Sequence, residues 1–441
     1  MKPSIRVKPP GPKARKILAR DSSVISQSMV RAYELVIEKA YGVNFQDVDG
    51  NVYLDFNSGI ATMNFGHSNP IITQAIKDQL EKATHPAFLE FYSQLPVTFC
   101  EELTKLMPDG LNTVFLSNSG AESVEAAMKL SRYHTNRKYF LAFHGAFHGR
   151  TLGTLSLTAS KSVQRARFGP FLSAIHAPYA YPYRSRYPDD EDACAKECID
   201  YIEDEIFERM IPPDEFAAIF VEPVQGEGGY IVPPRKFLQE LRRICDEHGI
   251  LLVDDEVQSG CFRTGKFLAI EHFGVKPDIV CLAKALGGGL PLGATISSRE
   301  IMDWPRGAHA NTFGGNLLAC AAGKAVLSLM KKPSLGDEVA RKGQRIMKYL
   351  EDLQKNKKIL GDVRGLGLMI GIEFVEDRRT KKPAEKLRDR IVKTAFEKGL
   401  AILSAGKSSI RIAPPLIIEN DDIDAGLEIL TNSIEVSHRT L

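Results

Sequence analysis

Apolar runs alternate with helix-like segments along the middle of the chain, and each run stops at polar or glycine-rich residues. The runs cover residues 113–116, 139–143, 217–221, 250–253 and 279–283. Near-continuous apolar runs of this kind indicate a parallel sheet with helices on both faces. Ligands of such sheets bind beyond the carboxyl ends of the strands, where the polar residues fall. We therefore predict an α/β fold with one composite site at that edge.

Lys284 follows the run 279–283 and precedes the flexible, glycine-rich residues 285–289. A lysine between a buried strand and a mobile loop can be desolvated, which favours the neutral amine that attacks an aldehyde cofactor. We therefore consider an imine-forming lysine. The alternatives are a lysine in solvent or one that neutralises a phosphate.

The run 250–253 leads into Asp254, Asp255 and Glu256. Alternation along a strand directs Asp254 and Glu256 to one face and Asp255 to the other. A carboxylate beside the ring nitrogen of a pyridine-type cofactor keeps the ring protonated, and a protonated ring withdraws electrons from a substrate carbanion. Asp255 is the candidate for this role, with a structural ion pair or a metal ligand as alternatives.

The run 113–116 leads into Ser119, Gly120 and Ala121, where a helical pattern begins. Free backbone amides at a helix start suit a phosphate, with Ser119 as an extra donor and Gly120 allowing close approach. An ordinary helix cap would also use serine there.

The run 139–143 leads into a loop that contains Phe147, His148 and Arg150. Phe147 could lie against a planar cofactor, or it could pack in the core.

Short motifs are spread over nearly the whole chain, at 51–56 (NVYLDF), 119–122 (SGAE), 147–150 (FHGR), 221–223 (VEP), 255–258 (DEVQ), Lys284, 312–316 (TFGGN) and 411–416 (RIAPPL). Together they resemble the class III aminotransferases, the pyridoxal-phosphate-dependent enzymes of the ornithine and 4-aminobutyrate type. The resemblance implies fold type I, with a mostly parallel central sheet flanked by helices and a smaller α+β domain. It assigns residues 61–325 to the large cofactor-binding domain, and 1–60 and 326–441 to the small one.

The resemblance also implies roles for individual residues in a reaction with pyridoxal 5'-phosphate. Lys284 would hold the cofactor and act as nucleophile and general acid/base, and Asp255 would keep the ring nitrogen protonated. No metal ligand is expected. The other cofactor-binding residues are Ser119, Gly120 and Ala121 at the phosphate, Phe147 and Val257 on the ring faces, His148 in the loop of Phe147, and Gln258 at the phenolic oxygen. In this family the active site lies at the interface of a homodimer, where Thr312 would reach the phosphate of the neighbouring subunit; dimers could also pair.

Substrate recognition is implied by the 4-aminobutyrate branch of the family. The arginine matching Arg150 binds the carboxylate distal to the reacting carbon, and Ile60 would line that pocket. Arg411 would bind the α-carboxylate of glutamate or 2-oxoglutarate in a bidentate fork. Glu222 would pair with Arg411 when the substrate lacks that carboxylate, while a surface ion pair is the alternative.

These residues imply an ω-amino acid transaminase that moves the amino group of 4-aminobutyrate to 2-oxoglutarate and yields a semialdehyde and L-glutamate. An ornithine-type aminotransferase or an amino-acid racemase could use the same scaffold, and a non-catalytic binding protein could retain it. Leu317 stands where many relatives have proline, so the turn beside Thr312 is expected to differ.

Length and composition add few constraints. The 441 residues exceed the limit of about 250 to 300 for one core, so two domains are expected. The net charge of +2 gives no reason to propose nucleic acid or acidic membranes as partners. No run approaches the roughly 18 apolar residues of a membrane helix, so we expect a soluble protein.

We interpret the seven cysteines as reduced thiols of a cytoplasmic protein. Cys194 and Cys198 could share a helix face, but two ligands make a poor zinc site. The basic residues 1–20 contain several prolines, which favours a solvated arm over a transit peptide.

Overall fold

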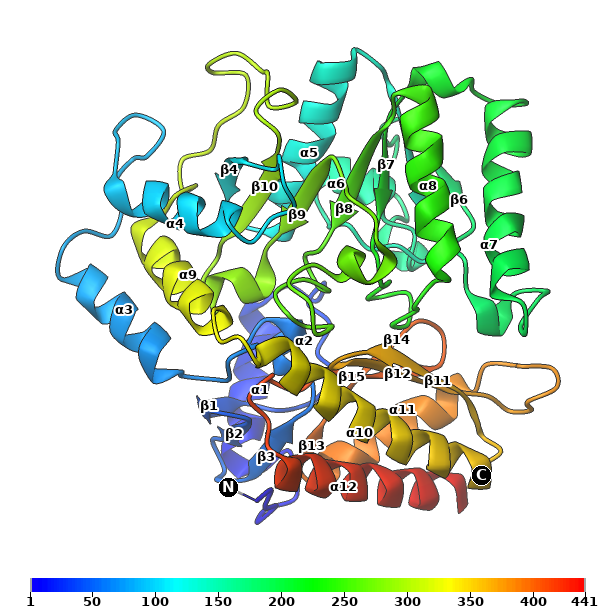
Figure 1. Cartoon of the computed structure of the whole chain (residues 1–441). Helices are drawn as coiled ribbons and strands as arrows, with labels where there is room; N and C mark the ends of the chain where they lie inside the picture. Colours follow the sequence, from blue (N-terminus) through cyan, green and yellow to red (C-terminus); the bar gives the residue numbers. More distant parts are fainter. Residues whose placement is uncertain (1, 440–441) are drawn as a thin grey trace. The chain divides into compact units, whose positions relative to one another are not determined.

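The computed structural model describes residues 2–439, which divide into two compact units (Figure 1). The first unit combines residues 1–70 with 341–441, and the second comprises residues 71–340. The sequence placed the corresponding limits after residues 60 and 325.

The second unit is built on a seven-stranded sheet in the order β4-β10-β9-β8-β7-β5-β6. Strands β5 to β9 pair in parallel, whereas β10 runs antiparallel to both β9 and β4. The strands are β4 (Thr113–Ser117), β5 (Tyr139–Phe143), β6 (Ala174–Ala177), β7 (Phe216–Val221), β8 (Leu251–Asp255), β9 (Ile279–Leu282) and β10 (Gly293–Ser297). Every residue of β7, β8 and β9 is buried, as expected for strands covered on both faces.

Helices surround this sheet. They are α3 (Pro70–Leu80), α4 (Gln94–Thr104), α5 (Gly120–Thr135), α6 (Leu152–Leu157), α7 (Glu191–Asp200), α8 (Arg235–His248) and α9 (Leu317–Met330), with short turns η1 (Ser162–Gln164), η2 (Pro182–Arg184), η4 (Pro213–Glu215), η5 (Ala269–Phe273) and η6 (Lys284–Gly287) and a π-helical turn η3 (Tyr201–Phe207). Helix α5 packs against β7, β9 and β10, and α8 packs against β8 (Figure 1).

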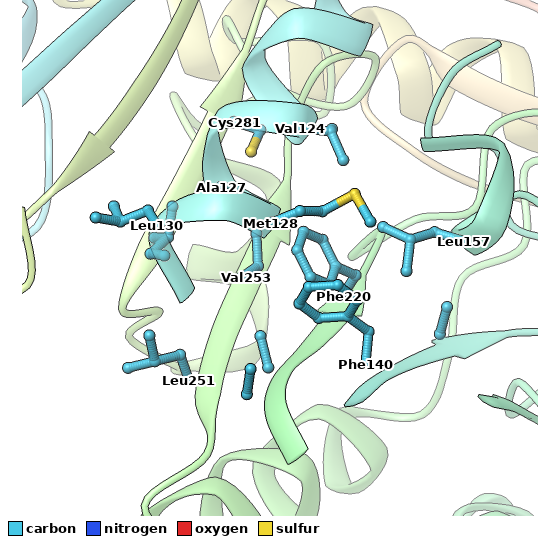
Figure 2. Close-up of a cluster of buried hydrophobic side chains, with 14 residues drawn as sticks. Val124, Ala127, Met128, Leu130, Phe140, Leu157, Phe220, Leu251, Val253 and Cys281 are labelled. Atoms are coloured by element: carbon cyan, nitrogen blue, oxygen red, sulfur yellow. The ribbon is translucent and has the colours of Figure 1, made fainter. Parts of the chain in front are cut away.

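The core beneath α5 shows why this helix forms here. Val124, Met128 and neighbouring residues lie on one helix face, and Met128 points toward Phe140 and Phe220 of the sheet (Figure 2). All four side chains are at most 2 % exposed. Truncation of a buried methionine to alanine costs about 2–5 kcal/mol, so this contact contributes substantially to the stability of the unit.

The first unit contains two four-stranded sheets, in the orders β1-β2-β3-β13 and β11-β12-β15-β14. Strand β3 from the N-terminal segment pairs in parallel with β13 from the C-terminal segment. The strands are β1 (Ile37–Tyr41), β2 (Asn44–Asp47), β3 (Val52–Asp55), β11 (Leu360–Leu366), β12 (Met369–Phe374), β13 (Leu400–Ala401), β14 (Leu403–Ala405) and β15 (Ser409–Ile412). The helices are α1 (Pro12–Val24), α2 (Ser58–Ala61), α11 (Glu385–Glu397), α12 (Asn420–Arg439) and most of α10 (Leu335–Asn356).

No helix within residues 2–439 has both the length and the apolar character that crossing a membrane requires.

Candidate active site

Most of the polar residues singled out in the sequence follow strands that end at the same edge of the large sheet. Strands β5, β7, β8 and β9 are parallel, and two successive antiparallel pairings through β10 give β4 the direction of β9. The carboxyl ends of these strands therefore face the same way. Ser119, His148, Glu222 and Lys284 lie beyond those ends, and Asp255 is the last residue of β8.

Asp255 and His148 form a buried pair at the centre of this edge. Nδ1 of His148 lies 2.7 Å from Oδ2 of Asp255, and the two residues are 3 % and 4 % exposed. The other carboxylate oxygen, Oδ1, accepts the backbone N–H of Val257. Burial by itself would lower the pKa of His148, but the hydrogen bond to Asp255 and the charges of Asp255 and Glu222 raise it above its ordinary value of 6.5. Nδ1 of His148 therefore carries a proton and donates a hydrogen bond to Oδ2 of Asp255.

The loop that carries Phe147 and His148 is fastened to the end of α6 by Thr158, which the sequence did not single out. The Thr158 hydroxyl accepts the backbone N–H of His148 and donates to the carbonyl of Gly149, both at 3.0 Å. Phe147 is partly exposed, and the guanidinium of Arg150 lies over its ring, 5.5 Å from the centroid. Core packing alone therefore does not account for Phe147.

The start of α5 has the features of a phosphate cradle and of an ordinary helix cap at once. Ser119 caps the helix, since its Oγ accepts the backbone N–H of Glu122 at 3.1 Å. Gly120 and Ala121 begin the helix, and their amides donate to no acceptor within residues 2–439. Two free amides at a helix N-terminus are suited to a phosphate dianion.

Glycines bring this cradle against the neighbouring loops. A Cβ atom on Gly120 would lie 2.7 Å from Cγ1 of Val257, and one on Gly149 would lie 2.9 Å from Cβ of Ala121. Real Cβ atoms do not approach so closely, so both positions require glycine. The cradle, Val257 and the Phe147 loop are thus packed against one another.

Lys284 opens the turn η6 with a φ of 43° and is partly buried. A left-handed backbone is uncommon for lysine and costs about 1–3 kcal/mol unless the surroundings impose it. Strain of this kind is concentrated at functional sites, which agrees with a special role for Lys284.

Glu222 is 5 % exposed, so the surface ion pair considered from the sequence does not describe it. Its carboxylate accepts the backbone N–H groups of Phe147 (3.0 Å) and Gly226 (3.1 Å). Burial raises the pKa of Glu222 to about 7, against the opposing effects of His148 and the two backbone donors.

Gln258 is partly buried and has a partner that the sequence did not indicate. The hydroxyl of Tyr230 donates to Oε1 of Gln258 at 2.9 Å. Tyr230 lies in the glycine-rich loop after β7, where neither periodicity nor a motif distinguishes it.

Thr312 is exposed, and its segment is fixed by Asn311. Nδ2 of Asn311 donates to the carbonyl of Leu116 at 2.9 Å, and Oδ1 accepts the amide of Gly314. Leu317, the departure from the family pattern, is the first residue of α9, after the cap residue Asn316. Proline is common at this helix position, and leucine also fits there.

Ile60 and Arg411 belong to the first unit, and their roles stay predictions. Ile60 is 41 % exposed and has φ 64°, within a left-handed turn that Asp55 holds by accepting the amides of Asn57 and Ser58. Arg411 lies on β15 and is 6 % exposed.

Comparison with known proteins identifies the family of this chain. Residues 25–434 match the model of the family described as aminotransferase class-III. The chain is 36 % identical to an alanine/serine racemase of Pyrococcus horikoshii (98 % of this chain, 93 % of the relative) and 36 % identical to the 4-aminobutyrate aminotransferase of Escherichia coli (96 % and 98 %). It also resembles the solved structure of an amine transaminase from an uncultivated Pseudomonas species in its PLP-bound form, with 31 % identity, a TM-score of 0.84 and coverage of 94 % and 97 %. The chain therefore belongs to the class III aminotransferases, with the α/β fold of type I and pyridoxal 5'-phosphate as its cofactor.

Proposed function

We propose that this enzyme moves the amino group of 4-aminobutyrate to 2-oxoglutarate and yields a semialdehyde and L-glutamate. The observation that carries the proposal is the position of Arg150. Its exposed side chain lies over the ring of Phe147, the residue proposed to cover one face of the cofactor ring. A guanidinium there can bind the carboxylate at the far end of an ω-amino acid. The similarity to the Escherichia coli enzyme supports the same substrate.

The residues at the sheet edge fit pyridoxal phosphate. The free amides of Gly120 and Ala121 suit its phosphate, Val257 and Phe147 suit the two faces of its ring, and Asp255 suits its ring nitrogen. When bound, the cofactor supplies an aldehyde and a protonated ring that withdraws electrons from the reacting carbon.

The enzyme's own groups then have distinct tasks. Lys284 holds the cofactor through Nζ, and after release by the substrate amine the same atom accepts the proton lost from the carbon that bears the amino group. His148 orients the carboxylate of Asp255, and Asp255 in turn would keep the proton on the ring nitrogen. Arg411 is the proposed partner of the glutamate α-carboxylate, and Ile60 is proposed to line the pocket for the carbon chain.

The proposed assembly is a homodimer, in which Thr312 serves the neighbouring subunit. The second unit displays large apolar side chains near Thr312: Phe91 is 67 % exposed, Tyr92 98 % and Phe313 59 %. Segments 88–97 and 306–314 line a hollow of about 810 Å³. Exposed apolar surface of this kind is typical of a protein interface. All seven cysteines are reduced thiols, which supports a cytoplasmic location.

A racemase is the second candidate, because the Pyrococcus horikoshii relative is named for that reaction. Both reactions use the same lysine and the same electron-withdrawing ring, whereas an oxo-acid is consumed only in transamination. An ornithine-type aminotransferase would differ in the amino donor.

The test is to incubate the purified, cofactor-loaded enzyme with 4-aminobutyrate and 2-oxoglutarate and to quantify L-glutamate. We expect glutamate only when both substrates are present, and none from Lys284→Ala. Arg150→Met should raise KM for 4-aminobutyrate at least about tenfold, because it removes a charged hydrogen-bond donor. Racemisation of an L-amino acid without glutamate formation would overturn the proposal in favour of the racemase.

A further inference from the structure

The loop that follows β7 contacts the side-chain amide of Gln258 on two sides. On one side, the hydroxyl of Tyr230 donates to Oε1 at 2.9 Å. On the other, the backbone of Gly226 lies so close that a Cβ atom there would be 2.3 Å from Nε2. The side-chain amide therefore has little freedom to move away from this loop.

The loop itself is closed and anchored. Gln225 and Ile231 exchange backbone hydrogen bonds of 3.0 and 3.1 Å across its base, and Gly226 donates its amide to the buried carboxylate of Glu222. Because the loop is held in place, the hydroxyl of Tyr230 can hold the side-chain amide of Gln258 in a fixed position.

Tyr230 occupies an unfavourable backbone conformation within this loop. It is fully buried and has a φ of 55°. A bulky residue with left-handed φ is a clear outlier, and such strain persists only where the surroundings impose it. The strain places the hydroxyl, rather than another part of the loop, at the Gln258 amide.

The two ends of a glutamine amide differ in chemistry but hardly in shape. The oxygen accepts hydrogen bonds and the nitrogen donates them. The Tyr230 hydroxyl donates to Oε1, so Nε2 is the end of the amide left to serve as a donor elsewhere. Reversal of the amide would instead present a carbonyl oxygen to an anionic partner, which is repulsive.

We propose that Tyr230 is a positioning residue that orients the Gln258 amide so that Nε2 donates to the phenolic oxygen of pyridoxal phosphate. The inference rests on the proposed function and on the role at the phenolic oxygen that the family resemblance implies for Gln258. A donor at the phenolic oxygen stabilises its negative charge and weakens its hold on the neighbouring proton of the bound cofactor. Loss of the donor should therefore raise the midpoint of the titration, which is the pH at which half of the bound cofactor has lost this proton.

The experiment is a pH titration of the visible absorbance of the bound cofactor in wild type, Tyr230→Phe, Gln258→Ala and the double variant. Tyr230→Phe keeps the ring and removes only the hydroxyl. Tyr53→Phe is the matched control, because Tyr53 is also fully buried and donates its hydroxyl to a side chain, that of Asp47, in the other unit. Thermal unfolding of the two tyrosine variants checks that both are folded.

We expect Gln258→Ala to raise the midpoint by about one pH unit, the size expected for one hydrogen bond to a charged group. Tyr230→Phe should raise the midpoint by about half as much. In the Gln258→Ala background, the same substitution should cause no further shift of the midpoint. The midpoint of the control Tyr53→Phe should equal that of wild type. An unchanged midpoint in Tyr230→Phe, with a shifted one in Gln258→Ala, would show that Tyr230 only packs the loop and would overturn the inference. An unchanged midpoint in Gln258→Ala would remove both the assigned role of Gln258 and the inference. A wild-type enzyme that binds no cofactor would instead contradict the proposed function itself.

Discussion

Nδ1 of His148 lies 2.7 Å from Oδ2 of Asp255, and both side chains are almost wholly buried. The pair joins two loops far apart in the sequence, at the ends of β5 and β8. Removing one member leaves the other without its partner inside the protein.

His148→Gln tests this pair. We expect a loss of stability of about 3–5 kcal/mol, because a buried charge loses its partner, together with weaker cofactor binding. The raised pKa of His148 means that its contribution is fully present below pH 6.5 and is lost as the pH rises through the folded-state value. Urea unfolding at a series of pH values should show this alkaline loss in wild type and not in the variant. Equal pH profiles would indicate that His148 is neutral in the folded protein.

Gly120→Ala tests the contact between the phosphate cradle and Val257. The new methyl group would lie 2.7 Å from Cγ1 of Val257, so overpacking should cost about 1–3 kcal/mol and weaken cofactor affinity. Val257→Ala should restore part of the stability in the double variant, because it removes the clashing atom. The free energy of unfolding and the cofactor affinity are measured for wild type, the two single variants and the double variant, which form a double-mutant cycle. If the effects of the two substitutions on the free energy of unfolding were strictly additive, the contact between Gly120 and Val257 would be contradicted.

Asp254 is a buried carboxyl that the proposed mechanism does not use. It is 0 % exposed, and neither oxygen accepts a hydrogen bond from a donor within residues 2–439. Burial, followed by the charges of Glu256 and Asp255, raises its pKa well above 3.8, and the protonated form can donate to Glu256. Its stabilising contribution is therefore complete below pH 3.8 and declines as the pH rises.

Asp254→Asn should accordingly stabilise the enzyme at neutral pH, by an amount that grows with pH. The amide keeps a donor for Glu256 and cannot ionise. Asp246→Asn is the control, because that side chain is 68 % exposed. A neutral-pH melting temperature that falls in Asp254→Asn would mean that the ionised form is stabilised in the protein.

His176 should make the protein sensitive to acid. Burial lowers the pKa of His176 to about 4, although its hydrogen bond to the carbonyl of Leu157 opposes the shift. A depressed histidine contributes stability that is present above pH 6.5 and is lost as the pH falls toward 4. The loss amounts to about 3 kcal/mol at most. His176→Gln, which keeps a donor, should remove that part of the slope from chemical unfolding between pH 6.5 and 4, and an unchanged slope would refute the assignment.

The sequence predicted the strands β4, β5, β7, β8 and β9 of the large sheet and missed β6 and β10. The runs 113–116, 139–143, 217–221, 250–253 and 279–283 correspond to β4, β5, β7, β8 and β9, because strands covered on both faces must be apolar throughout. Strand β10, Gly293–Ser297, was not predicted, since a short segment with glycine, threonine and serine has no such pattern. The antiparallel pairing that aligns β4 with the other strands was therefore also missed.

The sequence likewise indicated some residues of the candidate site and missed others. Types of residue at strand ends, together with the family resemblance, indicated Lys284, Asp255 and Ser119. Thr158 and Tyr230 act through hydrogen bonds to residues 10 and 28 positions away in the chain, and no local pattern encodes such contacts. The left-handed backbone of Ile60 likewise depends on tertiary contacts, since isoleucine strongly disfavours it.

Transamination of 4-aminobutyrate can be observed through its first half-reaction alone. The purified, cofactor-loaded enzyme is mixed with 4-aminobutyrate in the absence of any oxo-acid, and the absorbance of the bound cofactor is followed. We predict conversion of the aldehyde form to the amine form, and its reversal when 2-oxoglutarate is added. An unchanged spectrum with 4-aminobutyrate, while a single L-amino acid becomes a mixture of D and L forms, would contradict the account.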